Sequence, residues 1–219
     1  MQGWFPHSLR IVLTVALPLV LVLTNVRLVL LPWFPPFEYG RPGFPPDAYG
    51  FTTAERKLHA ARAVDYLLNF AGIDFLAGER FVDGTSLYNE RELRHMQDVK
   101  AVTRGMLGVW RAAVVLALVA TIYLARQPVT RSLLRAALMT GSAIVVVVLT
   151  VLIVYLLLNF NSFFTNFHRV FFESGSWMFS YSDTLIRLFP LRFWSDVAVL
   201  VGGASLLEGL LVWLGARFI

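Results

Sequence analysis

The sequence predicts a mainly α-helical, polytopic membrane protein with four transmembrane helices and a small extracellular α+β cap. Of its 219 residues, 57% are hydrophobic and 15% are charged, and the mean hydropathy is +0.65. Soluble domains average about 45–50% apolar and about 25% charged residues. The apolar residues gather in four blocks, each long enough to cross a hydrocarbon core roughly 30 Å thick. The basic residues that exceed the acidic ones flank these blocks on one side only.

The first transmembrane helix is expected within residues 1–31, where residues 11–31 form an apolar run. This run is longer than the 7–15 residues typical of a signal peptide, and prolines follow it instead of a cleavage site. Residues 106–158 are expected to hold the second and third helices, joined by a short turn. The fourth helix is expected within residues 193–219.

Arginines set the expected orientation in the membrane. Five of them flank the spans on one side, without acidic residues: Arg10, Arg126, Arg131, Arg135 and Arg217. Lys and Arg in short flanks mark the cytoplasmic side. Both termini are therefore expected in the cytoplasm, and residues 32–105 and 159–192 outside. Because these flanks explain the net charge of +5, no nucleic-acid partner is expected.

Three ionisable residues fall inside the expected spans, where they are costly and by default mark a functional or water-lined place. Arg27 is close to its helix end, so its long side chain can reach the interface. Arg111 lies deeper, and either reaches the interface or lines a cavity open to the outside. Glu208 receives no chemical role from its position.

The outer segment 32–105 begins with a proline-rich run that is expected to be extended. A helix follows, capped by Thr52 or Thr53 and ended by Gly72. Residues 73–89 alternate weakly and are expected to form short strands. Asn89 and Glu92 form a capping-box pattern that opens a further helix toward the second span.

The first candidate site lies on that further helix, where His95 and Asp98 are three residues apart. This spacing places both side chains on one helix face, where the carboxylate can orient and charge the imidazole. The alternative is an ordinary surface pair. His95 precedes Met106 by about 16 Å along a straight helix, so a bend at Gly105, an earlier span or a folded-back cap is needed to bring it near the membrane.

The second candidate site lies in the aromatic segment 159–192, which is expected to complete the cap. His168 shares a helix face with Phe164, Phe171 and Phe172. The alternative is an interfacial helix with an aromatic belt. Burial among rings lowers the pKa of a histidine and keeps it neutral. A neutral imidazole can accept a proton from an amine or hydroxyl.

Three motifs resemble the lipoprotein intramolecular transacylase family of bacterial membrane proteins. They are E-x-x-H-M-x-D-V-K from Glu92, F-H-x-x-F-F from Phe167 with Trp177 beyond it, and D-T-L-I-x-L-F-P from Asp183 to Pro190. The resemblance implies a bacterial plasma-membrane enzyme with four spans and an extracellular cap. The implied reaction moves the sn-2 acyl chain of a diacylglyceryl-modified lipoprotein to the α-amino group of its own cysteine.

The same resemblance implies two catalytic histidines, which fall on His95 and His168. Asp98 and Glu92 are expected to support them. The residues expected to bind the lipoprotein and its membrane-lipid chains are Phe164, Phe167, Phe171, Phe172, Trp177 and Arg111. We assign His95 as the base, because Asp98 would raise its basicity.

The residues agree with this chemistry. The chain has no cysteine and no serine in a G-x-S-x-G pattern, so no acyl-enzyme is expected. An intramolecular transfer needs none, because amine and ester already belong to one molecule. No cofactor and no metal are expected. Two rival interpretations remain: a metal-dependent membrane hydrolase using His95, Asp98 and His168 as ligands, and a non-catalytic subunit that binds lipid.

Overall fold

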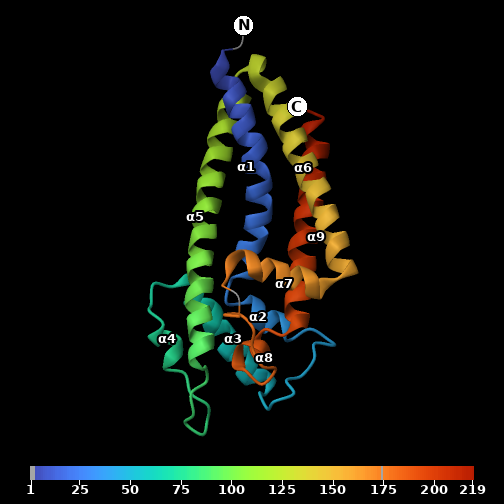
Figure 1. The fold of residues 1–219 in the computed structure, drawn as a ribbon. Helices are drawn as coiled ribbons and strands as arrows, with labels where there is room; N and C mark the ends of the chain where they lie inside the picture. The colour runs from blue at the N-terminus through green and yellow to red at the C-terminus, as the bar shows by residue number, and fades with distance from the viewer. Residues whose placement is uncertain (1–2, 174) are drawn as a thin grey trace. The chain divides into compact units, whose positions relative to one another are not determined.

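The protein folds into helices that belong to two compact units (Figure 1). The structure is a computed structural model and describes residues 3–173 and 175–219. We call the first unit the bundle unit; it comprises Met1–Arg27, Met106–Asn159 and Val199–Ile219. We call the second the site unit; it comprises Leu28–Gly105 and Phe160–Ala198. Each unit is described by itself.

Four helices are long and apolar enough to cross a membrane, as the sequence predicts. They are α1 (Trp4–Val29), α5 (Glu90–Arg126), α6 (Arg131–Leu158, preceded by the 3-10 turn Pro128–Thr130) and α9 (Leu191–Ala216). The Thr130 hydroxyl closes the turn between α5 and α6 by donating to the Leu124 carbonyl over 2.9 Å. The chain is therefore a multi-pass membrane protein.

The bundle unit packs through small and branched aliphatic residues. One buried cluster joins three of its helices through Leu13, Ala120, Leu124, Leu133, Leu134 and Ala137. Gly141 of α6 lies so close to α1 that an added Cβ would be 3.0 Å from the Thr14 carbonyl oxygen. Small residues allow such close approach of membrane helices, whose association depends on packing instead of on the hydrophobic effect.

Polar side chains inside the bundle unit bond to one another. The Asn25 amide donates to the Ser205 hydroxyl over 3.1 Å and to a Glu208 carboxylate oxygen over 2.9 Å. The indole N–H of Trp110 donates to the Thr24 hydroxyl over 3.0 Å. Glu208, for which the sequence suggests no role, thus helps to join α9 to α1.

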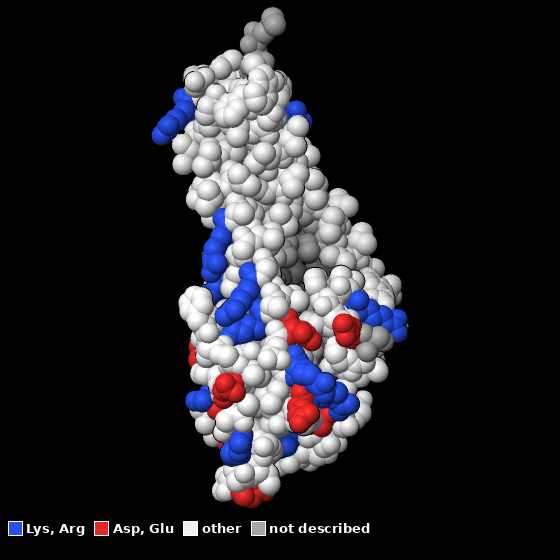
Figure 2. All heavy atoms as spheres, turned by 60° about the vertical axis from the view of Figure 1, so that its left-hand side comes forward, with Lys and Arg blue, Asp and Glu red and all other residues white. Residues whose placement is uncertain are grey.

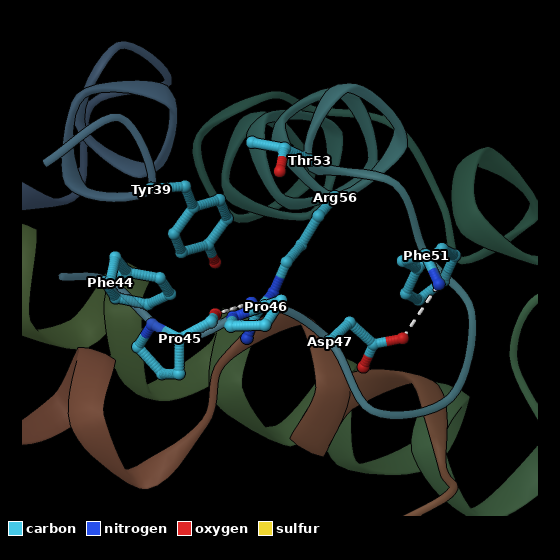
Figure 3. Close-up of a pocket in the computed structure, with 8 residues that line it drawn as sticks. All are labelled: Tyr39, Phe44, Pro45, Pro46, Asp47, Phe51, Thr53 and Arg56. Atoms are coloured by element: carbon cyan, nitrogen blue, oxygen red, sulfur yellow. Dashed lines mark hydrogen bonds between the residues drawn. The ribbon is translucent and has the colours of Figure 1, made fainter. Parts of the chain in front are cut away.

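The site unit combines short helices with the polar beginning of α5. The short helices are α2 (Phe34–Glu38), α3 (Thr53–Leu68), α4 (Asp74–Ala77), α7 (Phe160–Phe171) and α8 (Thr184–Leu188). The cap expected for α3 is confirmed: the Glu55 amide donates to the Thr52 hydroxyl, and the Thr52 amide donates to the Glu55 carboxylate. Buried Arg56 of α3 connects this region, donating to the carbonyl oxygen of Pro45 (Figure 3) and to that of Arg187.

The prediction of an α+β cap is wrong, because no strand forms in the described residues. Within residues 73–89 the chain forms α4 and then a turn held by an isolated bridge between Arg80 and Ser86. Gly84 lies within this turn and adopts a φ of 83°, and no further bridge follows the Arg80–Ser86 pair in the described residues. A single bridge without a neighbouring strand cannot extend into a sheet.

The proline-rich run also differs from the expected extended form, because it includes the helix α2. Pro35 and Pro36 occupy the first turn of this helix. Proline is tolerated there because the amide hydrogens of a first helical turn have no partner within the helix.

Helix α5 continues without a break through Gly105 and Gly108. Its 37 residues extend about 55 Å, which exceeds a hydrocarbon core of roughly 30 Å. The charged first part of α5, from Glu90 to Arg104, is therefore expected to lie outside the hydrocarbon. This part carries His95.

Candidate active site

His95 is positioned by the capped beginning of α5. The Glu92 amide donates to the Asn89 side-chain oxygen over 3.0 Å, and the Asn89 amide donates to the Glu92 carboxylate over 2.8 Å. The expected capping box is thus confirmed. The second Glu92 oxygen accepts the Leu185 amide of α8 over 2.7 Å. Burial raises the pKa of Glu92, which connects two helices next to His95.

His168 is positioned by the backbone of its own helix, α7. Its Nδ1 lies 2.8 Å from the carbonyl oxygen of Phe164. A carbonyl oxygen only accepts, so this Nδ1 must carry the proton. In a neutral ring, the lone pair on Nε2 is then the one able to receive a proton.

The structure brings the two histidines together although they come from distant parts of the chain. Their ring centroids are 6.4 Å apart, and the ring planes differ by 22°. Both histidines belong to the site unit. The sequence interpretation requires two imidazoles to converge on one aromatic site, and this geometry meets that condition.

Aromatic side chains surround the pair. His95 contacts Phe172 at 4.9 Å between centroids, and His168 contacts Phe164 at 4.0 Å and Trp177 at 4.9 Å. Phe167 lies 5.7 Å from His168. Phe171 contacts Phe167 and Phe172, so it belongs to the next layer of rings.

Two aromatic residues of the site were missed by sequence reasoning. Phe179 lies 5.3 Å from His95, and Trp194 of α9 lies 6.4 Å from Phe164. Phe179 follows the turn at Gly175, outside the helix whose periodicity identified the other rings. Arg91 lies over the Phe179 ring and forms an ion pair with Asp183 over 3.0 Å. No local pattern in the sequence indicates this packing.

The surroundings of both histidines favour neutral rings. Burial, with a smaller contribution from the charge of His168, lowers the pKa of His95 to about 4. Burial also lowers the pKa of His168, and the hydrogen bond to Phe164 partly opposes this shift. Within the described residues, His95 Nδ1 and Trp177 Nε1 are buried and have no hydrogen-bond partner.

Asp98 does not perform the role expected from its spacing. Its side chain is exposed, and no hydrogen bond or ion pair joins it to His95 in the described residues. The expectation that Asp98 raises the basicity of His95 is therefore wrong, because burial lowers the pKa of this histidine instead. Arg111 belongs to the bundle unit, and its place at the site stays a prediction.

The described residues do not form the metal site that a rival hydrolase would need. Among them, no three His, Cys, Asp or Glu side chains are grouped so that they could hold a metal ion. Within the same residues, no carboxylate is grouped with His95 and His168 as a third ligand. A separate cavity of about 100 Å³, shown in Figure 3, contains neither histidine. Its lining residues are Tyr39, Phe44, Pro45, Pro46, Asp47, Phe51, Thr53 and Arg56.

Four membrane-spanning helices, together with two histidines in an aromatic cluster, define an integral membrane protein with a candidate active site. The family model described as lipoprotein intramolecular transacylase Lit matches residues 11–194, which is most of the chain. The chain belongs to this family. It is therefore an acyltransferase that acts in lipoprotein maturation.

Solved structures share this fold, and a sequence relative aligns with most of the chain. The lipoprotein intramolecular transacylase Lit from Bacillus cereus is 21% identical, with a TM-score of 0.82 over 99% of this chain and 96% of that chain. A variant of that protein with one histidine replaced by alanine gives a TM-score of 0.74 at 20% identity, over 99% and 94%. An uncharacterized protein from Aquifex aeolicus (strain VF5) is 29% identical over 215 residues, which is 96% of each chain.

Proposed function

We propose that this protein moves the sn-2 acyl chain of a diacylglyceryl-modified lipoprotein onto the α-amino group of the same cysteine, with His95 and His168 as the acid–base pair. The observation that carries the proposal is the 6.4 Å approach of the two rings within an aromatic cluster. Neither imidazole forms an ion pair with a carboxylate in the described residues, so both rings are free to interact with the substrate.

The reaction balances within one molecule. The amine nitrogen attacks the carbonyl carbon of the sn-2 ester, and a new C–N bond forms. The bond from that carbon to the glyceryl oxygen breaks, and a proton from the amine finally resides on this oxygen. The product is an amide with a free glyceryl hydroxyl, so neither water nor a cofactor enters the reaction.

His168 is the better candidate for the base, in place of His95. Its Nδ1 proton is held by the Phe164 carbonyl, and this leaves the Nε2 lone pair to accept the amine proton. The same hydrogen bond favours the protonated ring that forms next. His95, whose protonated form is less stable because of its burial, donates a hydrogen bond from its neutral ring to the oxyanion, and the proton accepted by His168 passes on to the glyceryl oxygen.

Trp177 supplies a second donor beside the base. Its indole N–H is buried without a partner in the described residues, and its ring lies 4.9 Å from His168. An ester oxygen that gains negative charge in the transition state would satisfy this group. The surrounding phenylalanines keep water away from an ester that it would otherwise hydrolyse.

The proposed topology places both termini in the cytoplasm and residues 32–105 and 159–192 outside the bacterial plasma membrane. Support comes from the bundle unit, in which the beginning of α1, the turn between α5 and α6 and the end of α9 lie at one end (Figure 1). These segments carry Arg10, Arg126, Arg131 and Arg217, the excess of basic residues that marks a cytoplasmic side.

The test is mass spectrometry of a diacylglyceryl lipopeptide after incubation with the purified protein. We expect one acyl chain to move to the nitrogen without a change in total mass. His168→Gln should lower the rate by about 10²–10⁴-fold, the range typical of a lost acid–base group. His7→Gln is the control, because His7 is exposed at the beginning of α1. Release of a fatty acid to water would indicate a lipase, and full activity of both His168→Gln and His95→Gln would indicate a non-catalytic subunit.

A further inference from the structure

Phe70 is an aromatic side chain of the site unit that is almost completely solvent-exposed. Its exposed fraction is 97%, in the segment between α3 and α4. Burying a phenylalanine side chain is worth about 1.5–3 kcal/mol, so a ring kept outside the core forgoes this stabilisation. Val82, with an exposed fraction of 98%, is the comparable aliphatic case in the same unit.

The exposure of Phe70 does not come from an unattached loop, because α5 holds both neighbours of the residue. The Lys100 ammonium donates to the Asn69 side-chain oxygen over 3.1 Å and to the Ala71 carbonyl over 2.7 Å. The Arg104 guanidinium donates to the Asn69 carbonyl over 3.3 Å. Two cations therefore fix the backbone on either side of the ring and direct the ring away from the unit.

Positive charge accompanies the ring. The Arg104 guanidinium is 5.9 Å from the Phe70 ring centroid, and its side chain is exposed. Neither Arg104 nor Lys100 forms an ion pair with a carboxylate in the part of the chain that is described. Figure 2 turns the α4 and α5 side toward the viewer and shows Lys and Arg side chains on this face. A surface with exposed aromatic and basic groups complements an anionic lipid headgroup layer.

Position along α5 indicates the depth of these groups. Arg104 precedes Met106, where the apolar stretch of the helix begins, by only about 3 Å of helix rise. Arg104 is therefore expected at the membrane surface, and Phe70 lies against it. Val82 belongs to the turn before Glu90, and the helix from Glu90 to Arg104 extends about 21 Å. Val82 is thus expected to remain in water.

We propose that Phe70 and Arg104 form an interfacial anchor that binds the surface of an anionic membrane. The ring inserts at the boundary between headgroups and acyl chains, and the guanidinium contacts lipid phosphate. Through the bonds to Lys100 and Arg104, the anchor holds the early part of α5, and with it His95, at a fixed height above the hydrocarbon. This role is independent of the chemistry assigned to the histidines.

The absence of cysteine allows a direct measurement of depth. Phe70→Cys and Val82→Cys each introduce a single site for a nitroxide spin label. In phosphatidylglycerol vesicles, we expect the relaxation of the label at 70 to be enhanced mainly by oxygen, which concentrates in lipid. The relaxation of the label at 82 should be enhanced mainly by a water-soluble nickel chelate. Equal exposure of both labels to the nickel chelate would overturn the proposal. If Phe70→Cys fails to fold, Ala71→Cys gives the same comparison.

A second comparison tests the charge. Arg104→Gln should shift the label at 70 toward water in phosphatidylglycerol vesicles, and the shift should be absent in phosphatidylcholine vesicles. Arg94→Gln is the matched control, because Arg94 is an exposed arginine of α5 whose hydrogen bond, among the described residues, is to the Glu90 carbonyl of its own helix. An Arg104→Gln shift of equal size in both lipids, or no shift in either, would overturn the role of the anionic headgroup. Acyl-transfer rates play no part in this outcome.

Discussion

Burial favours the neutral form of both imidazoles of the site, but within the described part of the chain only His168 has a tautomer fixed by a hydrogen bond. His95 is buried between Phe172 and Phe179, and its Nδ1 has no partner among the described residues. His168 is half-buried, and the Phe164 carbonyl fixes its tautomer. Only the second ring is therefore ready to receive a proton on a defined nitrogen. The spacing of residues in the sequence does not show this difference. It is the reason why we propose His168, and not His95, as the base.

The lowered pKa values predict how activity depends on pH. A base must be unprotonated, so activity is lost as pH falls through the pKa of His168. Because burial lowers this pKa, the acidic decline of kcat/KM should lie below pH 6.5, the ordinary value for histidine. The measurement is kcat/KM across acidic pH, which reports the free enzyme.

Phe172 provides the control for this profile, since its ring contacts both histidines. Phe172→Ser should admit water, weaken the effect of burial and move the acidic decline upward toward pH 6.5. A decline at or above pH 6.5 in the unchanged protein would contradict a neutral, buried base.

Glu92 and Asp98 give a contrasting pair of variants at the residue scale. Glu92 has an exposed fraction of 1% and accepts the amides of Asn89 and Leu185. In Glu92→Gln, an amide group replaces one accepting oxygen, and we expect a loss of about 1–3 kcal/mol in the free energy of unfolding. Asp98→Asn should change neither stability nor acyl transfer more than slightly. Thermal unfolding measures the stability of both variants, and the lipopeptide assay measures their acyl transfer. A large loss of activity in Asp98→Asn would show that Asp98 takes part in the reaction.

At the scale of elements, the aromatic helix α7 was the most predictable part of the site. Phe164, Phe171 and Phe172 share a face with His168 because a helix repeats every 3.6 residues. This period says nothing about Phe179 or Trp194, which reach the same cluster from a loop and from α9. The short strands were mispredicted for a similar reason, since alternation over a few residues cannot show whether a partner strand exists.

The close contact of α6 with α1 yields a prediction about an element. In Gly141→Ala the new methyl group would lie 3.0 Å from the Thr14 carbonyl oxygen and 3.1 Å from a Leu17 methyl group. We expect a loss of about 1–3 kcal/mol in stability, as is usual for overpacking. Gly203→Ala in α9 is the control, because its Cβ would meet nothing within 4 Å. Thermal unfolding in detergent checks both variants, and equal midpoints would mean that α1 moves aside without cost.

At the scale of the whole molecule, the proposed topology can be tested in cells with single cysteines. Val82→Cys lies in an exposed turn of the site unit, and Gln127→Cys lies in the exposed turn between α5 and α6. A membrane-impermeant maleimide should label the first in intact spheroplasts and the second only after lysis. The positive flanks around Gln127 are the reason to expect this order. The opposite pattern of labelling would reverse the orientation.

The sequence by itself determined the four spans, the capped beginnings of α3 and α5, and the two histidine motifs. These features depend on local composition and spacing, which a linear chain displays directly. The tertiary structure alone decided the α-helical character of residues 73–89, the isolation of Asp98 and the addition of Phe179 and Trp194 to the site. It also fixed the tautomer of His168 through the Phe164 carbonyl. Such properties follow from burial and from contacts between distant segments, and no local pattern encodes them.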